Sequence, residues 1–152
     1  MSNTFHKSGY VSIVGNPNVG KSTLVNKLIG RDLTITTPKA QTTRHRILGL
    51  INGENYQLVL SDTPGIIDPA YEMQNSMMNF VKESLVDADV LIYMIAVDED
   101  QTRDEKLLDK IKKIKIPLLV LINKIDSSNQ KELESAVSYW SSVFLSAKII
   151  PI

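Results

Sequence analysis

A short segment near the N-terminus constrains the fold more than any other part of the chain. It reads Gly15-Asn16-Pro17-Asn18-Val19-Gly20-Lys21-Ser22, with Thr23 behind it. This spacing fits G-x-x-x-x-G-K-[ST], the pattern of a phosphate-binding loop between a strand and a helix. An apolar run, Tyr10–Val14, precedes the segment, and a helix-like run, Lys21–Ile29, follows it. We therefore predict that backbone N–H groups of this loop surround the phosphates of a nucleotide. Lys21 would lie beside the β- and γ-phosphates, and the Ser22 hydroxyl would bind Mg²⁺. A glycine-rich turn that binds nothing is the alternative.

Hydrophobic periodicity predicts alternating strands and helices along the rest of the chain. The predicted strands are Tyr10–Val14, His45–Ile51, Tyr56–Leu60, Val90–Val97, Leu118–Ile122 and Lys148–Ile152. The predicted helices are Lys21–Ile29, Met73–Val86, Gln101–Ile114 and Gln130–Trp140. Asn52-Gly53 lies between the second and third strands and indicates an antiparallel hairpin. The fold class is therefore α/β, a mostly parallel sheet with one antiparallel edge strand and helices on both faces.

Composition limits the classes of function that remain. A length of 152 residues with 43% hydrophobic side chains suits one domain. The chain has 17 basic and 17 acidic residues and hence no net charge that would attract nucleic acid. We therefore expect no direct nucleic-acid site in it. The absence of cysteine excludes disulfides and thiolate metal sites. No apolar run is long enough to span a membrane, and residues 1–7 lack a secretory core, so we expect a soluble intracellular protein.

Two further motifs follow predicted strands. Asp62-Thr63-Pro64-Gly65 offers a carboxylate that can hold Mg²⁺ through water, and the Gly65 N–H can reach a γ-phosphate oxygen. An ordinary Asp-x-Pro-Gly turn is the alternative. In Asn123-Lys124-Ile125-Asp126, the Asp126 carboxylate can accept from two adjacent guanine donors that adenine lacks. Lys124 can pack over the base, and Asn123 can tie this segment to the phosphate loop. Because ligands bind at the carboxyl ends of parallel strands, we expect all three motifs on one edge.

Together these motifs resemble those of the P-loop GTPases. More narrowly, the chain is similar to the Era branch of bacterial GTPases in the segment Ile35-Thr36-Thr37-Pro38-Lys39-Ala40-Gln41-Thr42-Thr43-Arg44-His45-Arg46-Ile47, followed by Asp62-Thr63-Pro64-Gly65-Ile66. The resemblance covers about Tyr10 to Asp126 and, more loosely, the rest. It implies a cytoplasmic G domain that binds GTP or GDP with Mg²⁺, hydrolyses GTP slowly and acts as a nucleotide switch. For the parent, meaning the longer protein that contains such a G domain, it also implies peripheral association with membranes. A binding module with negligible turnover and a P-loop ATPase or small kinase remain alternatives.

The resemblance also assigns roles in catalysis. Lys21, Thr43 and Gly65 would act on the phosphates, and Thr43, chosen over Thr42, would join Ser22 and Asp62 on the metal. Ile66 stands where Ras-type enzymes carry a water-orienting glutamine, which implies slow turnover. Asn18 stands where potassium-dependent relatives carry an asparagine beside K⁺. A polar residue that merely holds the turn is the alternative at that position.

Era proteins also carry a C-terminal KH domain, and nothing in this chain resembles one. The resemblance therefore assigns the partners 16S ribosomal RNA and the 30S subunit, and the task of 16S rRNA processing and 30S assembly, to the parent through that missing domain. Ser146-Ala147 resembles the last element of a guanine pocket, yet it precedes the final predicted strand. We expect the true element beyond Ile152, and hence a G domain, residues 1–152, truncated before its pocket is complete.

Overall fold

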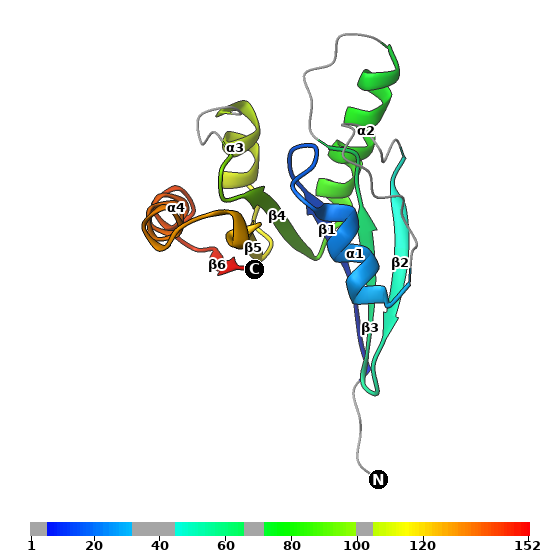
Figure 1. Cartoon of the computed structure of the whole chain (residues 1–152). Helices are drawn as coiled ribbons and strands as arrows, with labels where there is room; N and C mark the ends of the chain where they lie inside the picture. The colour runs from blue at the N-terminus through cyan, green and yellow to red at the C-terminus, as the bar shows by residue number, and fades with distance from the viewer. Residues whose placement is uncertain (1–5, 32–44, 66–71, 100–104) are drawn as a thin grey trace.

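The computed structural model describes residues 6–31, 45–65, 72–99 and 105–152 of the chain (Figure 1). Its strands are β1 (Lys7–Val14), β2 (Ile47–Asn52), β3 (Tyr56–Asp62), β4 (Val90–Ala96), β5 (Leu118–Asn123) and β6 (Lys148–Pro151). Its helices are α1 (Lys21–Ile29), α2 (Glu72–Asp87), α3 (Glu105–Lys112) and α4 (Gln130–Val143), with a short 3₁₀ turn, η1 (Ile125–Ser127). The predicted order of elements is confirmed, and their bounds differ from the predicted ones only at the ends. The predicted start of α3 at Gln101 lies outside the described residues.

The strands form one sheet in the order β2-β3-β1-β4-β5-β6. Strands β1, β3, β4, β5 and β6 run parallel, and β2 pairs antiparallel with β3 at one edge. The predicted mostly parallel sheet with one antiparallel edge strand is therefore confirmed. All five parallel strands end at the same edge of the sheet.

Local sequence signals explain where several elements begin and end. Helix α1 stops at Gly30, which has a left-handed φ of 77° and donates its N–H to the Asn26 carbonyl at 2.9 Å. Helix α4 begins after Asn129, whose side chain accepts from the Glu132 N–H at 3.0 Å while the Glu132 carboxylate accepts from the Asn129 N–H at 3.1 Å. Such reciprocal capping satisfies two backbone donors that a helix start leaves unpaired.

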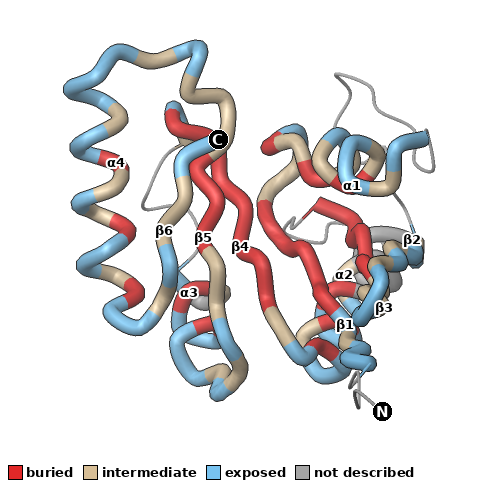
Figure 2. Tube along the Cα trace, turned by 90° about the horizontal axis from the view of Figure 1, so that it is seen from below, coloured by how far each residue is buried: buried red, intermediate tan, exposed pale blue. Residues whose placement is uncertain are grey.

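The sheet carries a hydrophobic layer on each face. On one face, Ile13 and Met94 pack with Val25 of α1. On the other, side chains of β4 and β5 pack against helices α2, α3 and α4. Figure 2 shows that buried residues dominate β4, as expected of a central parallel strand, and Val120, Leu121 and Ile122 of β5 are buried beside it. Helices therefore cover both faces, as predicted.

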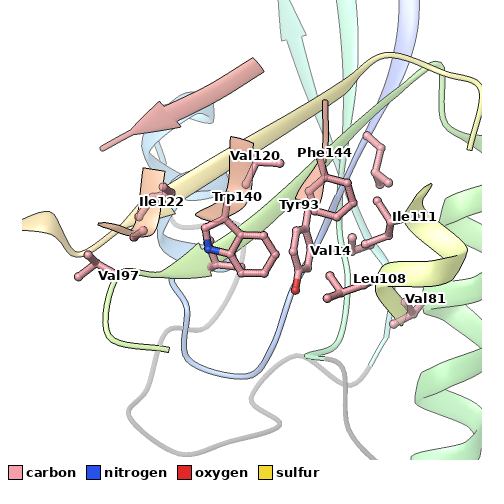
Figure 3. Packing of buried hydrophobic residues seen from close by; sticks show 13 residues of the cluster. Val14, Val81, Tyr93, Val97, Leu108, Ile111, Val120, Ile122, Trp140 and Phe144 are labelled. Carbon is pink, nitrogen blue, oxygen red and sulfur yellow. The ribbon is translucent and has the colours of Figure 1, made fainter. Parts of the chain in front are cut away.

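An aromatic group anchors α4 to the sheet (Figure 3). The Trp140 ring meets the Tyr93 ring edge-on, with 5.6 Å between centroids, and stacks on Phe144 at 6.0 Å. All three side chains are buried. Edge-on and stacked aromatic pairs each contribute about 0.5–1.5 kcal/mol beyond their burial. This packing holds β4 and β5 in place, and the loops after both strands border the site described next.

Among the described residues, no helix combines the length and the apolar character needed to cross a lipid bilayer.

Candidate nucleotide-binding site

The three predicted motifs meet at the carboxyl edge of the sheet. The phosphate loop follows β1, Asp62-Thr63-Pro64-Gly65 begins at the end of β3, and Asn123–Asp126 begins at the end of β5. Two side-chain hydrogen bonds join them. Ser22 Oγ donates to Asp62 Oδ2 at 2.7 Å, and Asn123 Nδ2 donates to the Val19 carbonyl at 2.8 Å. The expectation that one edge carries all three motifs agrees with these contacts.

Backbone conformation explains the second glycine of the phosphate loop. Gly20 has a φ of 105°, a region that side-chain-bearing residues rarely adopt, and it caps the start of α1. A Cβ atom at this position would lie 2.3 Å from Asn123 Nδ2. Glycine is therefore required twice over, by the backbone angle and by the close approach of the segment after β5. This fit brings the two ends of the candidate pocket together.

Lys21 is the most unusual charge in the site. Its ammonium group donates to the carbonyls of Gly15 at 3.0 Å and Asn16 at 2.8 Å, and only 6% of the residue is exposed. Burial lowers the pKa of Lys21 from 10.5 to about 8, and the nearby charges of Asp62 and Glu99 oppose that change. A buried ammonium group that lies inside the phosphate loop is suited to bind an anionic phosphate group.

The Ser22 hydroxyl and the Asp62 carboxylate form the candidate metal position. Magnesium prefers oxygen ligands and usually keeps several waters or substrate phosphates in its shell. Two oxygen atoms only 2.7 Å apart, beside a phosphate loop, provide the protein part of such a shell. The residues present therefore fit Mg²⁺. The third predicted ligand, Thr43, and its competitor Thr42 lie outside the described residues, as does Ile66.

The segment after β3 packs directly on the phosphate loop. Thr63 Oγ1 donates to the Ile13 carbonyl at 2.7 Å, and Thr63, Pro64 and Gly65 are all buried. A Cβ atom on Gly65 would lie 2.7 Å from the Cα atom of Pro17. The Gly65 backbone therefore lies against Pro17 of the phosphate loop.

The segment after β5 presents its carboxylate at the surface of the same edge. Lys124 adopts a left-handed φ of 62° and precedes the 3₁₀ turn that contains Asp126. The Ser127 N–H and hydroxyl both donate to the Lys124 carbonyl, at 3.0 Å and 2.7 Å, and stabilise this turn. Asp126 is exposed, whereas Asn123 is partly buried against the phosphate loop. Asp126 is therefore accessible to a base, while its neighbour fixes the segment.

The structure adds one site residue that the sequence analysis missed. Glu99, shortly after β4, accepts a hydrogen bond from the Asn16 side-chain amide through Oε1. Its other oxygen accepts from the Ala96 N–H at 3.1 Å. The carboxylate therefore connects Asn16 of the phosphate loop to Ala96 at the end of β4. A signal was available, because Glu99 follows a buried strand whose carboxyl end had to lie at the ligand-binding edge.

The backbone conformation of Asn18 offers a second explanation for the residue at this position. Asn18 is exposed and has a left-handed φ of 64°, a conformation that asparagine tolerates better than most residues. This gives a backbone reason for asparagine there that is independent of K⁺.

Ser146 and Ala147 lie in the turn before β6, where the Ala147 N–H donates to the Phe144 carbonyl at 3.1 Å. Because β6 runs parallel to β5, this pair lies at the edge opposite Asn123.

The chain combines a mostly parallel α/β sheet with a phosphate loop after β1, the Asp62 carboxylate beside Ser22, and an Asn-Lys-x-Asp segment after β5. This combination defines the G domain of a P-loop GTPase. Residues 10–124 match the family model described as 50S ribosome-binding GTPase. The chain belongs to this family.

Comparisons with individual proteins point to one branch of it. The GTPase Era of Staphylococcus epidermidis is 41% identical over 150 residues, which are 98% of this chain and 50% of the relative. A crystal structure of Era with MgGDPNP and a segment of 16S ribosomal RNA is 42% identical, covers 97% of this chain and 51% of its own, and superposes with a TM-score of 0.90. An Aquifex aeolicus Era variant bound to GDP and AlF4⁻ is 41% identical over 96% of this chain and 51% of its own, with a TM-score of 0.89. The predicted resemblance to Era is confirmed, and the chain spans about half the length of these relatives.

Proposed function

We propose that this chain is a G domain that binds GTP and GDP with Mg²⁺ and hydrolyses GTP slowly, acting as a nucleotide switch. The observation that carries this proposal is the hydrogen bond from Asn123 Nδ2 to the Val19 carbonyl. It joins the segment suited to read a base to the loop suited to bind phosphates, so both ends of one nucleotide can be held together. The similar Era structures, one with MgGDPNP and one with GDP and AlF4⁻, support the same choice of ligand.

Each phosphate-side residue has a distinct part in this proposal. Lys21 offsets the negative charge of the β- and γ-phosphates, and loop N–H groups donate to their oxygens. Ser22 and Asp62 would hold Mg²⁺ together with Thr43, and the bound ion would supply further charge neutralisation. The Gly65 N–H would contact the γ-phosphate only while that phosphate is present. Loss of this contact after hydrolysis would release the segments that report nucleotide state.

Slow turnover follows from the residue after Gly65. Ile66 has a side chain that can neither donate nor accept a hydrogen bond, so it cannot orient the attacking water. A single-turnover experiment that measures phosphate release from bound GTP tests this part of the proposal. Release that requires Mg²⁺ supports a GTPase, whereas GTP that stays intact throughout indicates a nucleotide-dependent binding module.

Base selectivity is assigned to Asp126. A carboxylate that must pair with two donors rejects a base without them by roughly 10⁴ or more in the best cases. Calorimetry should therefore find tight binding of GDP and weak binding of ADP. Asp126→Asn should weaken GDP binding by about 10² or more, because the amide cannot accept from both guanine donors. Asp109→Asn, at an exposed position on α3, is the matched control and should bind GDP normally. Equal binding of GDP and ADP by the unmodified chain would refute the assignment.

The wider role belongs to the longer protein. One similar structure contains Era together with 16S ribosomal RNA. We place this G domain in a cytoplasmic protein that acts in 16S rRNA processing and 30S subunit assembly, with RNA contacts made by a KH domain outside residues 1–152. Binding of the full-length protein to 30S subunits, compared in GTP and GDP, tests this role. Equal binding in both nucleotides would argue against a switch.

A further inference from the structure

The outer edge of the sheet at β2 is uncharged and apolar. Strand β2 reads Ile47-Leu48-Gly49-Leu50-Ile51-Asn52, and no described strand lies beyond it. Leu48 is 51% exposed and Leu50 is 54% exposed, and the period of two along a strand puts both on one face. Edge strands in soluble proteins usually carry charges, prolines or bulges that prevent pairing with another chain. This strand carries none of these devices.

The backbone of the same two leucines points away from the sheet. The Gly53 N–H donates to the Tyr56 carbonyl at 2.8 Å, so Gly53 and Tyr56 form a hydrogen-bonded pair. In an antiparallel ladder such pairs alternate with non-bonded pairs, and the β2–β3 register is continuous from Asn52 to Ile47. Ile51, Gly49 and Ile47 therefore direct their hydrogen-bonding groups toward β3. Leu50 and Leu48 direct theirs toward the outer edge, where a further strand would pair.

The sequence of this edge is symmetric. Ile-Leu-Gly-Leu-Ile reads the same in both directions about Gly49. An antiparallel second copy centred on Gly49 places Leu48 opposite Leu50 of the other chain, and Leu50 opposite Leu48. Both are then hydrogen-bonded pairs built from the outward-directed groups. A two-fold axis produces this kind of self-complementary contact.

Charge at the strand's end does not oppose this pairing. Arg46 donates through Nε to Ser61 Oγ at 2.7 Å and forms an ion pair through Nη1 with Asp87 at 2.8 Å. In the centred register Arg46 falls opposite Asn52 of the second copy, so no like charges meet. The leucines of both copies lie together on one face and can bury each other's exposed surface.

We propose that β2 pairs antiparallel with β2 of a second copy of this chain, in the register centred on Gly49, to form a two-fold symmetric dimer. This pairing extends the sheet across the axis. It does not depend on which nucleotide the chain binds, so its failure and the failure of the proposed function are separate results.

Sedimentation velocity over micromolar to millimolar protein tests the association. The chain should shift from monomer to dimer and no further as concentration rises. Leu50→Lys places a charge in each copy beside the axis and should weaken dimerisation by about tenfold or more. Leu145→Lys is the matched control, because Leu145 is 91% exposed and remote in sequence from the strand, and it should dimerise normally. A chain that stays monomeric, forms larger assemblies, or dimerises equally well as L50K refutes the proposal.

Disulfide cross-linking tests the register without adding charge, and the chain has no cysteine that could interfere. Hydrogen-bonded antiparallel pairs have Cα atoms about 5.5 Å apart, within disulfide range. A mixture of L48C and L50C chains should therefore oxidise to a covalent heterodimer faster than either variant alone. L145C chains give the rate of random collision. Cross-linking of the mixture at that random rate, or faster cross-linking of L50C with itself, contradicts the centred register.

Discussion

Removing the ammonium group of Lys21 should change how the stability of the nucleotide-free chain depends on pH. Burial lowers the pKa of Lys21 to about 8 in the folded chain, against 10.5 for an exposed lysine. Between these values the unfolded state binds more protons than the folded state, so stability rises with pH through this window. Below about pH 8 the destabilisation is fully present. The gap between the two pKa values corresponds to about 3 kcal/mol at neutral pH.

Lys21→Met isolates this contribution. The variant loses the charge and also the hydrogen bonds to the carbonyls of Gly15 and Asn16, but that second loss does not depend on pH. The free energy of unfolding of the unmodified chain, minus that of K21M, should therefore rise by about 2–3 kcal/mol from pH 7 to pH 10. Urea unfolding followed by far-ultraviolet circular dichroism, after removal of nucleotide with a chelator, measures both values.

Two controls sharpen this experiment. Lys27 is exposed on the same helix, so K27M controls for the loss of a lysine from α1 without the loss of a buried side chain. Saturation with GDP should flatten the rise for the unmodified chain, because a phosphate beside Lys21 stabilises its charged form. A K21M difference that is constant from pH 7 to pH 10 without nucleotide would show that burial does not destabilise the charge, and the reasoning would be wrong.

Three further changes test other parts of the site. Gly20→Ala should abolish detectable GDP binding by calorimetry and lower the unfolding free energy by about 1–3 kcal/mol, because the new methyl group combines backbone strain with a clash. Gly30→Ala is its control, since it keeps the strain but meets no atom within 4 Å, and GDP should bind normally. Glu99→Ala frees the Asn16 side chain and should speed release of labelled GDP several-fold in a stopped-flow assay; an unchanged release rate would mean that the contact is incidental. GTP hydrolysis should run faster in KCl than in NaCl if Asn18 helps to hold K⁺, whereas equal rates would leave that residue only its backbone role.

Much of the fold could be predicted because its signals are local. Apolar runs of strand length indicated β4 and β5, helical spacing indicated α1, and Gly30 marked the end of that helix. The site followed from one further rule, that ligands bind at the carboxyl ends of parallel strands. Three motifs placed after strands had to share an edge, whatever the order of those strands.

The features that the sequence did not predict depend on contacts between distant parts of the chain. Strand β1 begins at Lys7 rather than Tyr10, because its polar start pairs with Tyr56 at the hairpin and the Lys7 N–H donates to the Asn55 carbonyl at 2.9 Å. The position of Glu99 after β4 indicates the ligand-binding edge, but its contact with Asn16 depends on β4 lying next to β1, and hydrophobic periodicity does not specify which strands are adjacent. Helix α4 continues past Trp140 because the next turn still packs against the core.

The aromatic anchor also decides how this molecule can be observed in solution. Trp140 is the chain's single indole, and it is buried against Tyr93 on the sheet face opposite α1. Its intrinsic fluorescence therefore reports whether α4 stays docked on the sheet, and excitation of Tyr93 can transfer energy to it across 5.6 Å. A labelled nucleotide can report occupancy of the site, and the indole emission can report the integrity of the fold in the same sample.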